Sequence, residues 1–424
     1  EVSFEKTVQY LFSQLPMFQR DGNSAYKKDL TNTLQLCEFL GNPQHQFKSV
    51  HVAGTNGKGS SSHYLASVFQ EAGYKTGLYT SPHLKSFTER IRINGIEISK
   101  EFVVDFVEKI KPIIRHLAPS FFEITVAMCF DYFARKKVDI GIIEVGMGGR
   151  LDSTNVILPE VSLITNISLD HQKWLGNSVV EIAGEKSGII KPNRPIVISE
   201  SDDLTKKVFK ARAAQSEAPI YFADNQYRIE SRGTLNIYKK DELRVSLSTT
   251  YVPKYQMKNL KGVVYVVEVL NKKGFTISNE ALKLGLENSV VNTGFKGRWQ
   301  QLGKNPDIFC DVGHNEEGID HVIKQISSYT FDQLHFVLGV VDDKELNSIL
   351  SKLPQQAIYY FCQAGIPRAL SALELSKKAS EVGLEGVVVP DVNKAIERAK
   401  SAASKTDFIF IGGSNFVVAE IKDL

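Results

Sequence analysis

The sequence has few cysteines and no large excess of charge of either sign. Four cysteines, Cys37, Cys129, Cys310 and Cys362, stand far apart in 424 residues, with no CxxC pair and no matching histidine spacing. This argues against a disulfide framework or a structural zinc site and is typical of a reducing compartment. Lys and Arg number 51 and Asp and Glu number 48, a net charge of +3. So small a charge gives no reason to expect nucleic acid or an anionic membrane as the partner.

Long apolar runs are also missing. The most apolar stretches, such as residues 138–145 and 408–412, fall far short of the roughly 20 residues that a bilayer span requires. Residues 1–14 mix acids and lysine in an amphipathic pattern, whereas a signal peptide needs a basic end and a continuous apolar stretch. We expect a cytoplasmic protein with no membrane segment, and we expect it to act as a monomer.

What is present is an alternation of short Val- and Ile-rich runs with helix-period segments. With 42% hydrophobic and 23% charged residues, the composition is that of a globular protein, and at about 150 residues per domain the length predicts two domains. The alternation predicts an α/β fold with a parallel sheet covered by helices. The expected strands of the first domain are residues 48–53, 75–79, 138–145, 161–166 and 195–199. The expected helices are residues 58–71, 100–116, 121–136 and 179–189.

The pattern changes after residue 220. Residues 221–247 are polar and alternating, which predicts a small antiparallel patch within or beside the first domain. Two helices, 256–272 and 279–287, are then expected. A second βα series follows, with expected strands at residues 307–311, 333–338, 357–361, 386–389 and 407–411. We place the boundary near Thr293, giving domains 1–293 and 294–424.

The clearest chemical motif is GTNGKGS, residues 54–60, between an expected strand and an expected helix. A glycine-rich turn at a helix N-terminus can direct backbone N–H groups at phosphate, and Lys58 adds a positive charge. The motif departs from the usual G-x-x-x-x-G-K-[ST] form, because Val52 replaces the first glycine and Gly59 follows the lysine, which moves the hydroxyl to Ser60. Phosphate binding is favoured over a turn that is only structural.

Two further polar clusters follow expected strands. Residues 144–155, EVGMGGRLDSTN, begin with Glu144, and LDHQ at residues 169–172 contains His171. Ligands in open α/β sheets gather beyond the carboxyl ends of the strands, so these side chains are expected near the phosphate loop. Oxygen ligands there suit Mg²⁺ held against ATP phosphates. The alternative is a charged strand end with a glycine turn and a histidine on the surface.

The second half has its own polar strand ends. Arg298, in KGRW, follows the boundary, and Asp311, in DVGHN, follows an expected strand. Arg298 could contact phosphate and Asp311 the ribose hydroxyls of a nucleotide. The alternatives are an interdomain salt bridge for Arg298 and a turn-forming role for Asp311.

Five motifs in this order, GTNGKGS, TSPHL (80–84), EVGMGGRLDSTN, LDHQKWLG (169–176) and DVGHN (311–315), resemble those of folylpolyglutamate synthetases. The resemblance is to the bacterial dihydrofolate synthase/folylpolyglutamate synthase group, relatives of the Mur ligases, and it covers essentially the whole chain. It implies a Mur-ligase-like P-loop domain with a parallel sheet and a smaller Rossmann-like C-terminal α/β domain, with ATP bound between them.

The resemblance also implies a reaction. ATP phosphorylates the carboxylate of dihydropteroate or a folate, and the amine of L-glutamate then attacks the acyl phosphate. The implied cofactors are Mg²⁺ and ATP as co-substrate, with carbamylation of Lys186, which lies in GEKSG (184–188). The implied partners are folate or dihydropteroate, L-glutamate and ATP, without nucleic acid or membrane.

The family pattern assigns roles residue by residue. Catalysis falls to Lys58, His171 and Lys186, and the metal to Ser81, Glu144 and His171. ATP binding falls to Gly54, Thr55, Asn56, Gly57, Lys58, Gly59, Ser60, Asn259, Arg298 and Asp311. Substrate binding is expected at Phe122, Glu123, Thr125, His314 and Ser414.

Some positions depart from the pattern or have a second explanation. Pro253 stands where a glycine usually precedes the Tyr255–Gln256 pair, so the loop that leads to Asn259 could run differently from the family's. The aromatic pair at 121–122, with Glu123 and Thr125, could form a wall for a pterin ring. Equally, these residues could be the start of a core helix capped by Ser120.

Two other functions compete with folate ligation. A phosphate loop alone would also fit a nucleotide switch, although a switch needs only one domain. A Mur-type ligase acting on a cell-wall nucleotide is disfavoured, because such enzymes usually carry an additional N-terminal domain and here the phosphate loop begins at Gly54. A folylpolyglutamate synthase without the dihydrofolate synthase activity is a narrower version of the main hypothesis.

Overall fold

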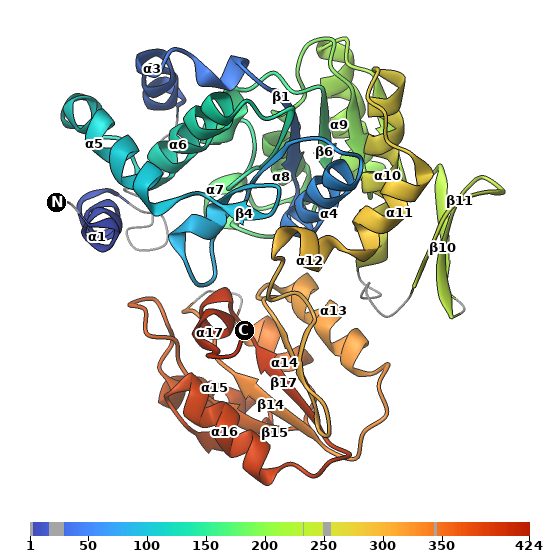
Figure 1. The fold of residues 1–424 in the computed structure, drawn as a ribbon. Helices are drawn as coiled ribbons and strands as arrows, with labels where there is room; N and C mark the ends of the chain where they lie inside the picture. Colours follow the sequence, from blue (N-terminus) through green and yellow to red (C-terminus); the bar gives the residue numbers. More distant parts are fainter. Residues whose placement is uncertain (1–2, 17–28, 232, 249–255, 343–345) are drawn as a thin grey trace. The chain divides into compact units, whose positions relative to one another are not determined.

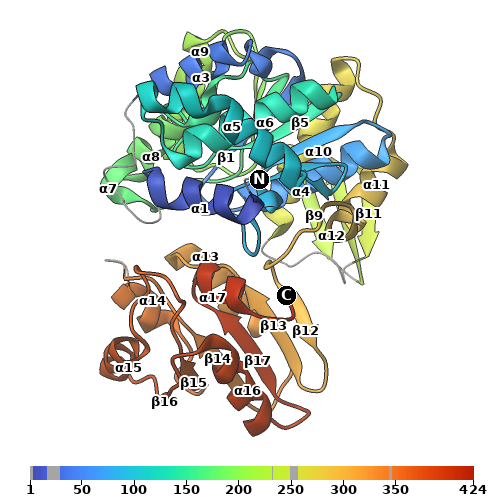
Figure 2. The same cartoon turned by 60° about the vertical axis from the view of Figure 1, so that its left-hand side comes forward.

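The computed structural model describes residues 3–16, 29–231, 233–248, 256–342 and 346–424. The chain divides into two compact units, the first ending at Phe295 and the second beginning at Lys296. The expected boundary at Thr293 lies two residues before this point. Each unit is built on its own sheet (Figures 1 and 2).

In the described part of the first unit, the main sheet has eight strands in the order β4-β3-β2-β5-β1-β6-β7-β8. The strands from β2 to β8 in this order pair in parallel, and β3 and β4 add an antiparallel hairpin at one edge. Their bounds are β1 Lys48–Ala53, β2 Thr76–Tyr79, β3 Ile91–Ile93, β4 Ile96–Glu97, β5 Ile140–Glu144, β6 Val161–Ile164, β7 Ile196–Ile198 and β8 Ile220–Phe222.

Helices cover both faces of this sheet. Alternate residues of a strand point to opposite faces, so Ile142 packs in one core and Ile143 in another. One core involves α4 Lys58–Glu71, α10 Met257–Lys272 and α11 Asn279–Glu287. The others involve α1 Phe4–Gln14, α3 Thr31–Phe39, α5 Lys100–Leu117, α6 Phe121–Lys136, α8 Val179–Ser187 and α9 Asp203–Gln215. Shorter helical segments are η2 Pro43–His45, η3 Phe87–Arg90, η4 Ser153–Val156, α7 Gln172–Leu175 and α12 Ser289–Thr293.

The antiparallel patch expected at residues 221–247 forms β9 Tyr227–Ser231, β10 Thr234–Lys239 and β11 Glu242–Ser248. Its predicted start needs a correction. Tyr221 lies in β8, which pairs in parallel with β7 as the edge of the main sheet. The short segment Ile220–Phe222 is bounded by neither glycine nor a long apolar run, so its sequence did not separate it from the polar strands that follow.

The described part of the second unit holds six strands in the order β12-β13-β17-β14-β15-β16, all parallel except β12. The strands are β12 Gln300–Gly303, β13 Asp307–Asp311, β14 Leu334–Leu338, β15 Ile358–Phe361, β16 Gly386–Val388 and β17 Phe408–Gly412. The helices are α13 Glu316–Ile326, α14 Leu346–Lys352, α15 Ala372–Glu381, α16 Val392–Ala402 and α17 Asn415–Glu420. The fold class is therefore α/β in both units, as predicted.

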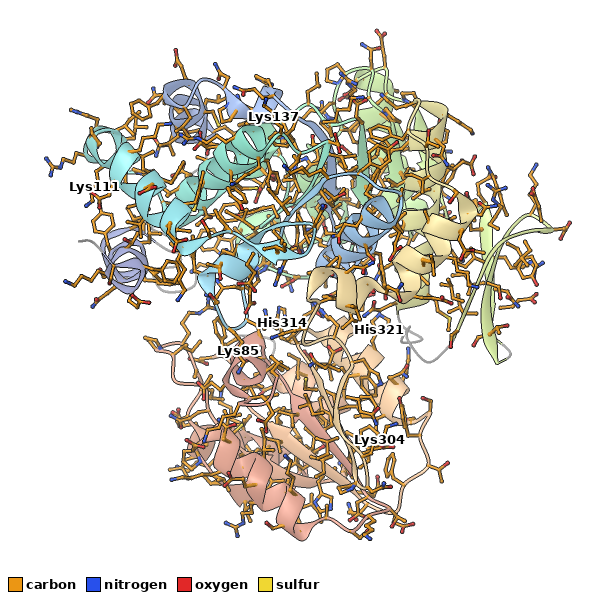
Figure 3. All side chains as sticks on the ribbon, in the orientation of Figure 1. Lys85, Lys111, Lys137, Lys304, His314 and His321 are labelled. Atoms are coloured by element: carbon orange, nitrogen blue, oxygen red, sulfur yellow. The ribbon has the colours of Figure 1, made fainter. Side chains whose placement is uncertain are left out.

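Both units carry charged side chains on the outside. Lys137 in the first unit and Lys304 in the second are exposed (Figure 3). Within the ranges that the structure describes, none of the helices combines the length and the apolar character needed to traverse a bilayer.

Candidate active site

The loop GTNGKGS joins the carboxyl end of β1 to the first turn of α4. Gly54 has φ +148° and Gly57, the N-cap of α4, has φ +82°. A Cβ at residue 54 would lie 1.8 Å from Thr165 Oγ1, so a side chain has no room there. The two glycines therefore turn the chain sharply into a helix whose first N–H groups have no carbonyl partner within the helix. Such a helix start binds anions.

Residues at the end of β6 hold this loop in place. The backbone N–H of Thr55 donates to the Asn166 carbonyl at 3.0 Å, and that of Asn56 donates to Asn166 Oδ1 at 2.8 Å. Thr165 Oγ1 donates to the Asn56 carbonyl at 2.5 Å. These bonds cross from one strand end to the next, so the loop is fixed before any ligand arrives.

Two lysines meet at the loop. Lys58 Nζ donates to the carbonyls of Gly54 and Thr55 at 3.0 and 3.1 Å, and Lys186 Nζ donates to the same Gly54 carbonyl at 3.0 Å. Lys186, on α8, is buried. Its burial and the nearby Lys58 cation lower the pKa of Lys186 to about 7. The neutral amine of Lys186 is therefore easier to form near neutral pH than that of an exposed lysine.

The structure brings two of the expected metal ligands together. Glu144 ends β5, and its Oε2 accepts a hydrogen bond from the Ser81 N–H at 3.1 Å. A Cβ at Gly59 would lie 3.6 Å from Glu144 Oε1, which places this carboxylate beside the first turn of α4. Oxygen atoms at this point suit a hard cation such as Mg²⁺.

His171 lies on a different loop, with φ +51° as the N-cap of α7. Its Nε2 is 3.8 Å from Asp170 Oδ2. Asp170 in turn is one of the carboxylates that act on the pKa of Lys186. In the part of the chain that the structure describes, no group of three or more His, Cys, Asp or Glu side chains is arranged to hold a metal. The expected metal ligands, Ser81, Glu144 and His171, include only two residues of these four types, so they could not form such a group by themselves.

Asn259, on α10, lies against the phosphate loop. A Cβ at Gly57 would come within 2.3 Å of Asn259 Oδ1, so the amide occupies the space beside the N-cap of α4. The sequence motif around Asn259 predicted an ATP contact, and the structure places the side chain at the phosphate loop. Pro253, which departs from the family pattern, and Tyr255, which belongs to the motif before Asn259, lie outside the described residues.

The segment considered as a pterin wall is the start of α6. Glu123 and Ser120 form a capping box, in which Glu123 Oε2 accepts from the Ser120 N–H at 2.6 Å. Thr125 Oγ1 donates to the Phe122 carbonyl at 2.9 Å, and the residue is fully buried. The side-chain groups of Glu123 and Thr125 thus have partners within the protein, which favours the capped-helix interpretation for these two residues. The Phe122 ring packs against Gly146, where a Cβ would come within 2.4 Å of it.

In the second unit the expected residues make mostly local contacts. Asp311 is buried and accepts from the N–H groups of Trp299 and Gly313 at 2.8 and 2.7 Å. Arg298 Nη1 lies 3.9 Å from Asp311 Oδ1. Ser414 caps α17 by accepting from two backbone N–H groups, and His314 is exposed, with Nδ1 3.0 Å from the Val312 carbonyl (Figure 3).

Comparison with known proteins places this geometry in a family. The model described as Mur ligase middle domain matches residues 52–267, and that described as Mur ligase, glutamate ligase domain matches residues 297–415. The dihydrofolate synthase/folylpolyglutamate synthase of Bacillus subtilis is 33% identical over 412 residues, covering 93% of this chain and 94% of that protein. The chain belongs to this Mur ligase family.

Other family members agree with this assignment. The folylpolyglutamate synthase of Lacticaseibacillus casei is 31% identical over 87% of each chain. The crystal structure of the folylpolyglutamate synthase of Thermotoga maritima superposes with a TM-score of 0.82 at 30% identity, over 98% of this chain and 95% of that one. Membership in the Mur ligase family makes the chain an ATP-dependent ligase.

Two residues that position the ligase loop were not predicted from the sequence. Thr165 and Asn166 make the cross-strand bonds to Asn56. In the sequence they are two ordinary polar residues at the end of an expected strand, and only their position could have indicated a role. They follow β6, which is the neighbour of β1 in the sheet, but the order of strands is not written in a single sequence.

Proposed function

We propose that this ligase adds L-glutamate to dihydropteroate, to reduced folates, or to both, through an acyl phosphate. The observation that carries the proposal is the fixed loop at the start of α4, with the Lys58 ammonium and Asn259 beside it, in a chain whose relatives are named for these two activities. A Mur ligase with a cell-wall substrate would share the loop, so the relatives decide between the two substrate classes.

In the proposed reaction, the substrate carboxylate attacks the γ-phosphorus of ATP and ADP leaves. The glutamate amine then attacks the acyl carbonyl, phosphate leaves, and the amine loses a proton. The first N–H groups of α4 and the Lys58 ammonium stabilise the negative charge on the transferred phosphoryl group, a task of positioning and electrostatics.

Mg²⁺ is the metal that we propose, held by Ser81, Glu144 and His171. A hydroxyl, a carboxylate and an imidazole leave room for phosphate oxygens and water, which Mg²⁺ usually retains. When bound, the ion would neutralise charge on the phosphates. A relative from Yersinia pestis, 27% identical with a TM-score of 0.85 over 98% of this chain and 96% of that one, was solved with AMPPNP and a Mn ion.

Carbamylation of Lys186 is part of the proposal. Carbamate forms when a neutral amine attacks CO₂ and releases one proton, and the lowered pKa of Lys186, about 7, supplies that neutral amine. The carbamate nitrogen keeps one hydrogen, so it can still donate to the Gly54 carbonyl. The product is an anion with oxygen ligands, whereas an ammonium has no lone pair. The ¹³C-NMR spectrum of the protein in ¹³C-bicarbonate should show a carbamate signal that is absent in Lys186→Arg.

The remaining assignments are weaker but follow the same scheme. Asn259, Arg298 and Asp311 are proposed to contact ATP, and Phe122 and His314 to contribute to the folate or glutamate sites. Glu123, Thr125 and Ser414 use their side-chain oxygens within the protein, so we propose that they shape these sites without bonding the ligand. Of these, Asn259 has the most direct support, because its side chain lies beside Gly57. We also propose a cytoplasmic monomer that has neither nucleic acid nor membrane as a partner, in keeping with the net charge of +3.

The deciding experiment offers the purified chain ATP, Mg²⁺ and glutamate with either dihydropteroate or tetrahydrofolate. Products extended by glutamate from both acceptors would establish both activities. Extension of tetrahydrofolate alone would leave a folylpolyglutamate synthase. Release of phosphate from ATP without an acceptor and glutamate would contradict ligation and favour a nucleotide switch.

A further inference from the structure

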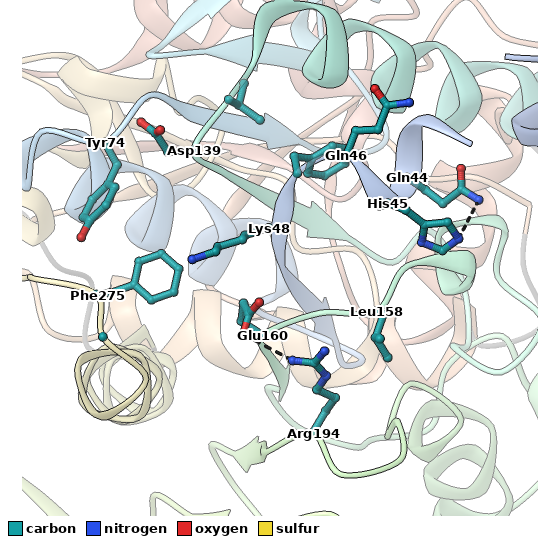
Figure 4. Close-up of a pocket in the computed structure, with 13 residues that line it drawn as sticks. Gln44, His45, Gln46, Lys48, Tyr74, Asp139, Leu158, Glu160, Arg194 and Phe275 are labelled. Atoms are coloured by element: carbon teal, nitrogen blue, oxygen red, sulfur yellow. Dashed lines mark hydrogen bonds and ion pairs between the residues drawn. The ribbon is translucent and has the colours of Figure 1, made fainter. Parts of the chain in front are cut away.

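A hollow of about 660 Å³ lies at the amino-terminal ends of the central strands of the eight-stranded sheet, whereas the phosphate loop follows the carboxyl end of β1 (Figure 4). Its lining comes from the segments that lead into four strands: Lys48 begins β1, and Asp139, Glu160 and Arg194 come just before β5, β6 and β7. The phosphate loop follows the other end of β1. Lys48 and Ala53 are five residue steps apart along β1, which at about 3.3 Å per step puts roughly 17 Å between the two places. The hollow is therefore not part of the candidate active site.

Lys48 adds a positive charge to the hollow, whose wall also carries the charged side chains of Asp139, Glu160 and Arg194. Its ammonium lies 5.0 Å from the centre of the Phe275 ring, which shields one side of it from water (Figure 4). Among the described residues, Lys48 has no carboxylate within ion-pair distance. A cation on an aromatic face without an ion-pair partner is a position where an anion can bind with favourable electrostatics.

The two carboxylates that line the hollow already have partners. Glu160 Oε2 lies 2.9 Å from Lys273 Nζ and 3.4 Å from Arg194 Nη1. Asp139 Oδ2 accepts from the Lys75 N–H at 2.7 Å. Because these acids remain in the wall, a ligand with several negative charges, such as a nucleotide, would be repelled, while a single anionic group beside Lys48 would be accepted.

The rest of the lining is suited to a flat ring. Phe47 and Tyr74 contribute half-buried aromatic side chains, and Leu158 is half-exposed at 49%. Phe275 is only 8% exposed, because it packs against Phe69 and Tyr74. Gly274 has open space where a side chain would stand. Aromatic rings stack on flat unsaturated groups, and the volume falls in the range of pockets that hold small molecules.

We propose that this hollow is a second ligand site, which takes a small aromatic monoanion with its charged group on Lys48 and its ring against the half-buried aromatic side chains of the wall, Phe47 and Tyr74. This site lies at the amino-terminal ends of the strands, so the proposal does not depend on the substrate of the ligase. Since Lys48 and the phosphate loop are the two ends of β1, a ligand here binds the strand that carries the catalytic loop.

The test uses ¹⁹F NMR of 4-fluorobenzoate with the full chain. A fragment of this size is expected to bind with Kd of about 1 mM. Lys48→Met keeps the length of the side chain but removes the charge, and should weaken binding about tenfold, the usual scale of a charge-assisted contact. The neutral probe 4-fluorobenzyl alcohol should bind about tenfold more weakly than the anion and should not distinguish Lys48→Met from the unmodified chain.

A matched control is Lys206→Met, which removes another lysine that lies over an aromatic ring, 5.2 Å from Phe222, outside the hollow. This variant should bind 4-fluorobenzoate like the unmodified chain. Ligation activity and thermal unfolding of Lys48→Met should also be unchanged, because Lys48 is exposed and lies outside the catalytic loop.

Several outcomes would overturn the proposal. Absence of binding at about 10 mM probe, a concentration well above the expected Kd, would do so. Equal binding by Lys48→Met and the unmodified chain would show that the anion occupies another place, such as the folate site. In crystals soaked with 4-bromobenzoate, anomalous bromine signal in the hollow would support the site, and signal only elsewhere would contradict it. None of these measurements requires turnover, so they stay informative if the proposed reaction fails.

Discussion

In the first unit, side chains from three other elements contact the loop after β1, whereas in the second unit the side chains of Asp311 and Ser414 bond to backbone N–H groups at most twelve residues away. Thr165 and Asn166 reach the phosphate loop from the segment that follows β6, Lys186 from α8 and Asn259 from α10. By contrast, Asp311 accepts from backbone groups two and twelve residues away.

Polar residues at strand ends therefore have two different roles in this protein: some position a loop that belongs to another element, and others stabilise their own turn or helix. Contacts between distant elements fix the shape of a loop while leaving the first N–H groups of α4 directed at a ligand. Local contacts satisfy the turn or the helix cap itself, as Ser414 does for α17. We therefore expect substitutions at the phosphate loop to act mainly on catalysis, and substitutions of Asp311 and Ser414 to cost stability as well.

The largest effect is expected for Lys58→Ala. Loss of one positioned charge at the phosphoryl group raises the activation barrier by about 3 to 4 kcal/mol, roughly 10²- to 10³-fold in rate. Steady-state release of ADP in the presence of folate and glutamate measures it. Thermal unfolding should change little, because the hydrogen bonds of the Lys58 ammonium go to carbonyls of the loop itself. Lys207→Ala, at an exposed position on α9, is the control. Near-normal turnover by a folded Lys58→Ala enzyme would remove the phosphate-loop assignment.

Asp311→Asn tests the second unit. The substituted amide side chain would present an NH₂ group to one of two backbone N–H donors, and leaving such a buried donor unsatisfied costs about 1 to 3 kcal/mol. We expect this loss in the free energy of unfolding, measured by urea denaturation. If stability stays the same while KM for ATP rises tenfold or more, Asp311 is chiefly a nucleotide contact, and the contrast between the units does not hold.

A double-mutant cycle examines the cross-element packing at Gly57. Alanine at a left-handed position costs about 1 to 2 kcal/mol, and the new Cβ would displace the Asn259 amide. Gly57→Ala should therefore raise KM for ATP. Asn259→Ala should raise it in the unmodified chain but add little in the Gly57→Ala background, because the amide is already displaced there. Additive effects would mean that Asn259 does not act at this loop.

Much of the fold and part of the candidate site could be predicted from the sequence, because they depend on local patterns. The apolar runs and glycine turn located β1 and α4 at the residues observed, and the motif order predicted the family. What could not be predicted depends on contacts between distant segments. Whether a polar strand-end residue faces a ligand or its own backbone is decided by which strands are neighbours, as Asn166 and Asp311 show. The cap that Ser120 forms at the start of α6 is local, and a helix start capped by Ser120 was one of two alternatives predicted for this segment, whereas the return bond from Glu123 was not predicted.

The smallest effect is expected for Ser414→Ala. Ser414 Oγ accepts from the N–H groups of Phe416 and Val417 at 3.1 and 3.2 Å, and the residue is buried. Loss of such an N-cap costs about 1 kcal/mol of stability, which is measurable as a lower urea midpoint. Since the hydroxyl is used by α17, KM for glutamate should stay within about twofold, because that change corresponds to only a few tenths of a kcal/mol. Ser414→Thr and Ser414→Asp keep an oxygen at the cap and should restore stability. A tenfold rise in KM for glutamate at unchanged stability would instead make Ser414 a substrate contact, which would give the second unit a ligand-facing strand end like that of the first.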